Sequence, residues 1–268
     1  MHPIERLRYV ARATGADPAV VAREAADALV EMARIQPAGL VPACKRLIDR
    51  HVASGPIWWL SARMLRSDDP ARAGRESAAE MDSDPTAGHL ADVLPDSATV
   101  LVVGWPDVAA DALRRRGDAE LLVVEWASEG EQFARRLRDR GSEVALVPES
   151  GAGPAAVVAD VVLIEALAAG PAGVAAVPGS MAVAAVAAHQ HVPVWAVTGV
   201  GRVLPQQLWD ALLSRLDESG LEPWDRAVEV VPADLVSHVV GPQGLVDAAD
   251  GLQAATCPAA PELFRPAG

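Results

Sequence analysis

Three glutamates stand where a parallel sheet would place its chemistry. Glu125 and Glu165 each end a short aliphatic run, and Glu149 follows a third such run after one proline. Carboxylates that converge at one edge of a sheet can transfer protons, raise one another's pKa, or bind sugar hydroxyls or a divalent metal. The alternative for each is a solvated charge at the rim of the sheet. All three are therefore candidate site residues.

A tight turn follows the first aliphatic run. It reads Gly104-Trp105-Pro106-Asp107, and the carboxylate of Asp107 stands near the N-terminus of the next predicted helix, where the helix dipole favours it. The turn lacks the GxGxxG pattern of dinucleotide sites. An indole at the mouth of a crevice either stacks on a ligand or fills the crevice itself. Gly104, Trp105 and Asp107 are candidate ligand-binding residues.

A candidate anion site precedes an alanine-rich segment. Gly179 and Ser180 stand at the expected start of that helix, whose exposed amides can bind a phosphate. Simple capping by Ser180 is the alternative. The chain holds no GxxxxGK[ST] phosphate loop, and His189 and His191 have no third ligand at a helpful spacing. We therefore predict neither a metal nor a bound cofactor.

Short aliphatic runs alternate with helical stretches from residue 97 onward. Their lack of polar alternation indicates strands that are buried on both faces. This order is typical of right-handed βαβ units in a mostly parallel, doubly wound, Rossmann-like sheet, in which ligands bind beyond the carboxyl ends of the strands. The predicted strands cover residues 99–104, 120–125, 143–147, 161–164, 193–197 and 228–231.

The first third of the chain has a helical pattern. Apolar residues recur with a period of 3.6, and Asp17 followed by Pro18 is a typical helix start. The polar segment 67–95 fits a linking helix followed by a loop. We predict an α/β protein with a helical N-terminal domain and linker over residues 1–96, followed by a Rossmann-like domain over residues 97–268.

The composition excludes several classes of partner. The chain has 268 residues and a net charge of −13, from 36 acidic and 23 basic side chains, which disfavours nucleic acid and anionic membranes. The chain has no run of 18 apolar residues and no signal-peptide core at its start. Cys44 and Cys257 are too far apart for a CxxC motif, and Cys44 is interpreted as a structural thiol. These features favour a soluble cytoplasmic protein.

Several stretches of the chain, taken in order, are similar to one known family. They are residues 57–65 (IWWLSARML), 98–113 (ATVLVVGWPDVAADAL), 129–150 (EGEQFARRLRDRGSEVALVPES), 159–199 (ADVVLIEALAAGPAGVAAVPGSMAVAAVAAHQHVPVWAVTG) and a tail at 224–225, 231–237 and 241–244. Their order and spacing resemble the alpha/beta/delta-subunit family of translation initiation factor 2B, which includes the 5-methylthioribose-1-phosphate and ribose-1,5-bisphosphate isomerases. The resemblance implies an N-terminal helical domain, a Rossmann-like C-terminal domain and a homodimer.

The chain departs from the isomerase branch of that family at the catalytic positions. Trp105 or its immediate neighbour stands where the family has its catalytic cysteine. Where the family has its GADR aspartate, residues 164–167 read IEAL. Either Glu165 replaces the aspartate after a small shift, which makes it the candidate catalytic residue, or the acid is absent and Leu167 stands in its place. The Asn-Lys of the family's NKIGT motif is replaced by AV at residues 176–177, which leaves only the Gly-Ser pair at 179–180.

Two functions are open at this point. The first is a non-catalytic or regulatory module, with a crevice for a phosphorylated sugar or nucleotide at the strand ends, that acts as a homodimer or on a protein partner. The alternative is a divergent aldose–ketose sugar-phosphate isomerase that uses carboxylates instead of cysteine and aspartate. Convergence of Glu125, Glu149 and Glu165 within about 10 Å favours the enzyme, given the short reach of proton transfer. A Trp105 ring that fills the crevice favours the module.

Overall fold

Helices make up the chain from Pro18 to Val93. The computed structural model describes residues 18–218 and 220–267, so Asp17, the predicted helix cap, lies outside the described residues. Pro18 is the first residue of α2, as predicted. The helices of this part are α2 (Pro18–Ile35), η1 (Pro37–Gly39), α3 (Leu40–Arg50), α4 (Gly55–Leu65), α5 (Pro70–Asp82) and α6 (Thr86–Val93).

The polar segment 67–95 forms two helices rather than the predicted helix and loop. α5 begins where the side chain of Asp69 accepts a hydrogen bond of 2.9 Å from the amide of Arg72. α6 begins at Thr86, whose amide and hydroxyl both donate to Oδ1 of Asp84. The prediction of a loop is wrong because α6 is short, so its sequence shows too few turns for a helical period to be visible.

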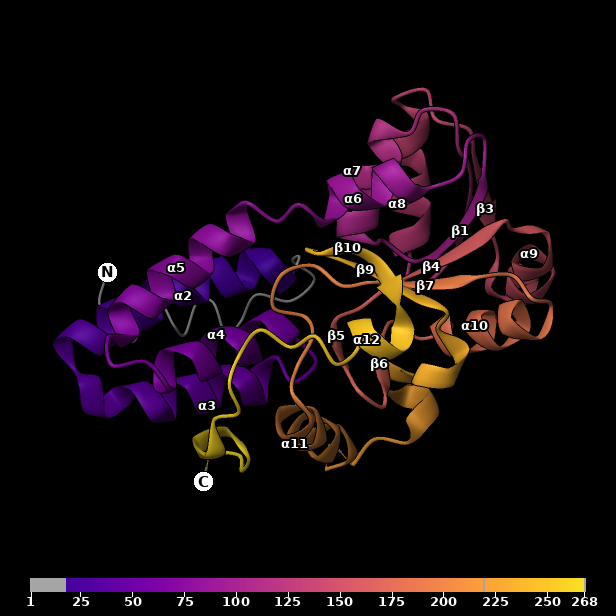
Figure 1. Cartoon of the computed structure of the whole chain (residues 1–268). Coiled ribbons are helices and arrows are strands. Elements are labelled where there is room, and N and C mark those ends of the chain that lie inside the picture. Colours follow the sequence, from indigo (N-terminus) through magenta and orange to yellow (C-terminus); the bar gives the residue numbers. More distant parts are fainter. Residues whose placement is uncertain (1–17, 219, 268) are drawn as a thin grey trace.

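A seven-stranded sheet in the order β10-β9-β7-β4-β1-β2-β3 forms the centre of the second part of the chain (Figure 1). Every neighbouring pair is parallel except β9 and β10, so the predicted mostly parallel sheet is confirmed. The strands are β1 (Thr99–Val103), β2 (Glu120–Val124), β3 (Val144–Val147), β4 (Val161–Glu165), β7 (Val194–Val197), β9 (His238–Gly241) and β10 (Gly244–Asp247).

The unbroken aliphatic runs are buried on both faces where their strands lie inside the sheet. β1, β4 and β7 are buried along nearly their whole length. β3 differs, because it is the edge strand and its residues Ala145 and Leu146 are exposed. The expectation of two covered faces is therefore wrong for β3.

The predicted strand at residues 228–231 does not join the main sheet. It belongs to a small antiparallel sheet of β5 (Ala168–Gly170), β6 (Gly173–Ala176) and β8 (Glu229–Pro232), in which β6 is the central strand. Gly173 permits the close pairing of β6 with β8, since a Cβ at this position would lie 2.3 Å from the carbonyl oxygen of Val231. Residues 228–231 are thus a strand, but in a second sheet.

Helices cover both faces of the main sheet (Figure 1). Val100 and Val102 of β1 pack in one apolar cluster with α6, α7 and α8, whereas Leu101 and Val103 pack in another with α9, α10 and α12. The bounds are α7 (Asp107–Arg115), α8 (Glu129–Arg138), η2 (Glu149–Gly151), α9 (Ala152–Val158), α10 (Ser180–His189), η4 (Ala233–Leu235) and α12 (Ala248–Gly251). Among the described residues, no helix is long and apolar enough to cross a bilayer.

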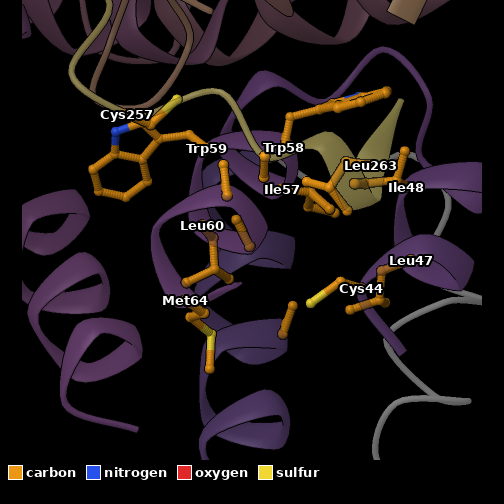
Figure 2. Close-up of a cluster of buried hydrophobic side chains, with 14 of the residues drawn as sticks. Cys44, Leu47, Ile48, Ile57, Trp58, Trp59, Leu60, Met64, Cys257 and Leu263 are labelled. Atoms are coloured by element: carbon orange, nitrogen blue, oxygen red, sulfur yellow. The ribbon is translucent and has the colours of Figure 1, made fainter. Parts of the chain in front are cut away.

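The core of the helical part includes residues from the end of the chain. Trp58 and Trp59 of α4 are fully buried, and Cys257 and Leu263 of the C-terminal segment belong to the same cluster (Figure 2). Trp209 joins this cluster from the second half of the chain. The remaining elements are α11 (Gln206–Asp217), η3 (Pro223–Asp225) and η5 (Pro261–Leu263). The helices of the first part and the C-terminal segment therefore share one core.

A buried arginine fastens the C-terminal segment to the helices. Arg215 of α11 donates from Nε to Asp49 Oδ1 at 3.1 Å, and from Nη2 to the carbonyl oxygen of Leu263 at 2.9 Å. Its guanidinium also lies 4.7 Å from the centre of the Trp58 ring. The contact fixes the last turn of the chain against α3 and α4.

Candidate functional site

Glu165, the candidate catalytic residue, ends β4 and is engaged at both carboxylate oxygens. Oε2 accepts a hydrogen bond of 3.0 Å from the amide of Ala109 in the first turn of α7. Oε1 accepts one of 2.9 Å from Nη1 of Arg202, which also donates to the carbonyl oxygen of Ala166 at 2.6 Å. The side chains of Arg202 and Glu165 are 2% and 11% exposed. A substrate would reach this carboxylate only by displacing a buried ion pair.

Arg202 was not singled out as a site residue by the sequence analysis. It stands in the turn after β7 and directly follows Gly201 in the sequence. Gly201 has a φ of +78°, which a glycine adopts without strain, and a Cβ at this position would lie 3.0 Å from the ring of Trp59. The only available signal in the sequence was its place just beyond a predicted strand, since the contact with Glu165 spans 37 residues. The cation nearest the candidate carboxylate is thus set by tertiary packing.

Asp84 is a second residue that the sequence analysis missed. Its Oδ2 accepts a hydrogen bond of 2.8 Å from the amide of Val200, in the same turn as Arg202. A Cβ at Gly199 would lie 2.6 Å from this oxygen and 3.4 Å from Nε of Arg202. The loop before α6 and the turn after β7 therefore meet in a cluster of two carboxylates and one guanidinium.

Trp105 packs on the protein's own side chains. The ring centroids of Trp105 and Phe133 are 5.7 Å apart, and Cζ of Arg136 lies 5.5 Å from the Trp105 centroid. Gly104 before it has a φ of +63°, which a glycine adopts without strain. The indole is half-buried against α8. Its aromatic and cationic neighbours are therefore side chains of α8, in the role that a stacked ligand would otherwise have.

A pocket of about 340 Å³ lies beside Trp105 and Asp107, between α2, α5, α7 and α8. It is lined by charges of both signs. Arg23 pairs with Asp82 at 2.8 Å across the opening, and Arg114 pairs with Asp111. Asp107 is placed at the first turn of α7, as predicted, where the dipole of the helix favours a negative charge. The pocket carries no net preference for an anion.

The carboxylate of Glu125 binds the first turn of α8. Its Oε2 accepts a hydrogen bond of 2.7 Å from the amide of Glu131, whereas its Oε1 is buried and has no hydrogen-bond partner among the described residues. Glu129 lies close by, and its pKa is raised by burial and then by the charge of Glu125. The two carboxylates therefore repel each other at the carboxyl end of β2.

The three candidate carboxylates lie on three different strands. In the strand order, Glu165 and Glu125 follow strands two positions apart, or about 10 Å, and Glu149 follows the edge strand, about 14 Å from β4. Glu149 is exposed in η2. No hydrogen bond joins any two of them among the described residues, and each carboxylate of the inner pair accepts a hydrogen bond from a backbone amide nearby.

The candidate anion site at Gly179 and Ser180 already holds a carboxylate. Gly179 has a φ of +93° and precedes α10, and the buried Ser180 is its first residue. The amide of Met181 donates to Oε1 of Glu229 on β8 at 2.5 Å. An anion at this helix N-terminus would compete with a side chain of the protein.

Neither thiol is placed to act as a nucleophile. Burial raises the pKa of Cys44 and of Cys257 to about 12, so both are protonated at neutral pH. Both lie in the core of the helical part, as a structural thiol does. Within the described residues, no group of three histidine, cysteine or carboxylate side chains could hold a metal ion.

The comparisons with known proteins place the fold. No protein-family model matches the chain, and no curated protein sequence does. The translation initiation factor eIF-2B of Pyrococcus horikoshii superposes with a TM-score of 0.75 at 15% identity, covering 94% of this chain and 98% of that one. eIF2B beta of Chaetomium thermophilum gives 0.71 at 15% identity over 94% and 90%, and the tetrameric eIF2B-beta2-delta2 complex of C. thermophilum gives 0.72 at 14% over 94% and 92%. The resemblance inferred from sequence is confirmed at the level of the fold.

Proposed function

We propose that this protein is a non-catalytic, initiation-factor-2B-like module that acts by assembling with protein partners. The observation that carries the proposal is the buried pair of Glu165 and Arg202, which engages the carboxylate that an isomerase would need to be free. Fold alone does not set function, so the proposal rests on the state of these side chains.

Aldose–ketose isomerisation needs a proton acceptor and a proton donor on the two sides of the reacting carbons. A general base must reach the proton within hydrogen-bond distance. Glu165 has both oxygens engaged, Glu125 is bound to the start of α8, and both thiols are buried. These contacts support a protein that does not carry out the reaction.

The same reaction needs a holder for the phosphate group of the substrate. The carboxylate of Glu229 already accepts a hydrogen bond at the N-terminus of α10, and the carboxylate of Glu165 already pairs with the guanidinium of Arg202. At either of these two places, a phosphorylated sugar or nucleotide would compete with a carboxylate of the protein. The isomerase alternative keeps one observation in its favour, which is the buried Oε1 of Glu125 that has no hydrogen-bond partner among the described residues.

Partner binding agrees with two features of the molecule. The solved relative from C. thermophilum is a tetrameric complex of two kinds of subunit, and this chain covers 92% of the matched subunit. The net charge of −13 suits a partner with a basic surface. We include self-association as a homodimer in the proposal, with sedimentation velocity of the purified chain as its measurement.

The proposal is tested by thermal denaturation with ribose phosphates, hexose phosphates and nucleoside monophosphates. We expect no shift of the melting temperature of the wild-type protein. A ligand at 100 times its dissociation constant adds about 2.7 kcal/mol, or roughly 5 °C or more for a chain of this size. A shift of that size with one sugar phosphate would overturn the proposal, because it would show that the protein binds that ligand. A single monomeric species at every concentration in sedimentation velocity would contradict the proposal of a homodimer.

A further inference from the structure

A second pocket, of about 300 Å³, lies at the carboxyl ends of β7 and β9. The turn after β7, the β9–β10 hairpin and the segment after α12 form its walls, and Glu80 of α5 reaches it from the helical part. We propose that this pocket binds a small organic cation, an amine or amidine carried on an apolar body. The lining of this pocket includes neither Glu165 nor Arg202, so the inference does not rest on the proposed function.

The shape of the pocket suits a compact apolar group. Its walls consist mainly of aliphatic side chains, such as Val200 and Val246, and of glycine backbone. A Cβ at Gly244 would meet no atom within 4 Å, so the hairpin leaves open space here. Small pockets at the junction of two parts of a protein are common ligand sites. The apolar lining supplies the binding area, and the polar groups decide the charge of the ligand.

The charges around the pocket are negative. Glu80 and Asp250 are the ionisable side chains in its lining, and both are acidic. Asp250 is exposed, and no ion pair to it occurs within residues 18–218 and 220–267. Glu80 pairs with Arg63 at 2.7 Å, outside the lining. A cation that entered the pocket would therefore meet an unpaired carboxylate.

One amide of the glycine-rich turn of residues 198–201 is already engaged, so an anion could not use it. Such turns can hold phosphates through their amides. Here the amide of Val200 already donates to Asp84, which adds a further negative charge behind the wall. Arg202, the cation of this turn, is paired with Glu165. The carboxylates around this turn therefore disfavour a phosphorylated ligand in this pocket.

A bound ligand would touch three parts of the chain at once. Besides the hairpin and Glu80, Ala254 and Thr256 line the pocket, and Thr256 accepts a hydrogen bond of 2.9 Å from Nε1 of Trp59. Occupancy would therefore strengthen the attachment of the C-terminal segment to the helices. Binding to the folded state alone raises the melting temperature by mass action.

The test uses three probes that share one ring and differ in charge: benzylamine, benzyl alcohol and benzoate. Their dissociation constants are measured by isothermal titration or ligand-observed NMR on the full chain. Affinities near 1 mM are expected for fragments of this size, about −4.1 kcal/mol. We expect benzylamine to bind about fivefold more tightly than benzyl alcohol and about 25-fold more tightly than benzoate, because a unit charge about 4 Å from a carboxylate in water gains about 1 kcal/mol if it is positive and loses as much if it is negative.

Two variants and one control locate the binding. Ala254→Leu fills the pocket from an exposed position and should abolish binding of all three probes. Asp250→Asn should lower the affinity for benzylamine about fivefold and leave that for benzyl alcohol unchanged. Asp92→Asn, at an exposed acid on α6, should change neither. The proposal is overturned if benzoate binds as well as benzylamine, if Ala254→Leu leaves benzylamine bound, or if benzylamine does not bind at about 10 mM.

Discussion

Nη1 of Arg202 lies 2.9 Å from Oε1 of Glu165 and 2.6 Å from the carbonyl oxygen of Ala166, with almost no solvent on either side chain. The pair joins the end of β4 to the turn after β7. Because water is excluded, loss of one partner leaves a buried charge without compensation. The candidate catalytic carboxylate is therefore engaged by an interaction that also supports the fold.

Arg202→Met should lower the free energy of unfolding by about 3–5 kcal/mol, because Glu165 then keeps a buried charge. The double variant Arg202→Met/Glu165→Gln should recover more than half of that loss. Urea denaturation of the single and double variants measures both values. A loss below about 1 kcal/mol in the single variant would show that the pair is solvated rather than closed.

Glu229→Ala should open the N-terminus of α10 to external anions. The carboxylate stabilises that end through the amide of Met181 and the helix dipole, so its removal should cost about 1 kcal/mol. Sulfate at millimolar concentration should then raise the melting temperature of the variant and leave the wild type unchanged. Glu149→Ala, at an exposed site, is the matched control. Equal responses of wild type and variant to sulfate would contradict the account.

Cys44 and Cys257 should resist alkylation in the folded protein. Burial raises the pKa of each thiol from 9.0 to about 12, so the thiolate is scarce at pH 8. Iodoacetamide should react about 100-fold more slowly with the folded chain than with the chain in concentrated urea. Peptide mass spectrometry assigns each site. Since the folded pKa is raised, the thiols' contribution to stability is complete below pH 9.0 and is lost as the pH rises through about 12.

Glu129→Gln should change how stability depends on pH. The pKa of Glu129 is raised above 4.5 by burial and by the charge of Glu125, so the protonated form favours folding. That contribution is present below about pH 4.5 and is lost as the pH rises through the folded pKa. The variant should therefore melt higher than wild type at pH 7 and equally at pH 4. Glu131→Gln, at the exposed neighbour, should show no such gain, and a gain of equal size there would refute the role of burial.

The parallel sheet was predictable because its strands are local features. The aliphatic runs of β1, β2, β4 and β7 are long enough to show in the sequence, and α7 and α8 have a clear helical period. β5 and β6 read AAG and GVAA, and alanine and glycine have low strand propensity. These two strands form because β8 pairs with β6, a contact that no local pattern records.

The sequence predicted where the candidate site lies better than it predicted which side chains contact each other there. Glu165 and Trp105 lie at the carboxyl ends of their strands, as the rule for parallel sheets requires. Arg202 and Asp84 reach the site through contacts that span 37 and 116 residues. Whether a carboxylate is free or paired depends on such contacts. The sequence therefore indicated where chemistry would occur but not that the groups are already engaged.

The most direct measurement of the central claim is turnover by the purified wild-type chain. The protein is incubated with ribose 1,5-bisphosphate and with 5-methylthioribose 1-phosphate, and phosphorus NMR follows the appearance of the ketose product. We predict no product above the uncatalysed rate, with either substrate, for wild type and for Glu165→Gln alike. Product formation by the wild type that Glu165→Gln abolishes would contradict the account, because Glu165 would then be a working base rather than half of a closed ion pair.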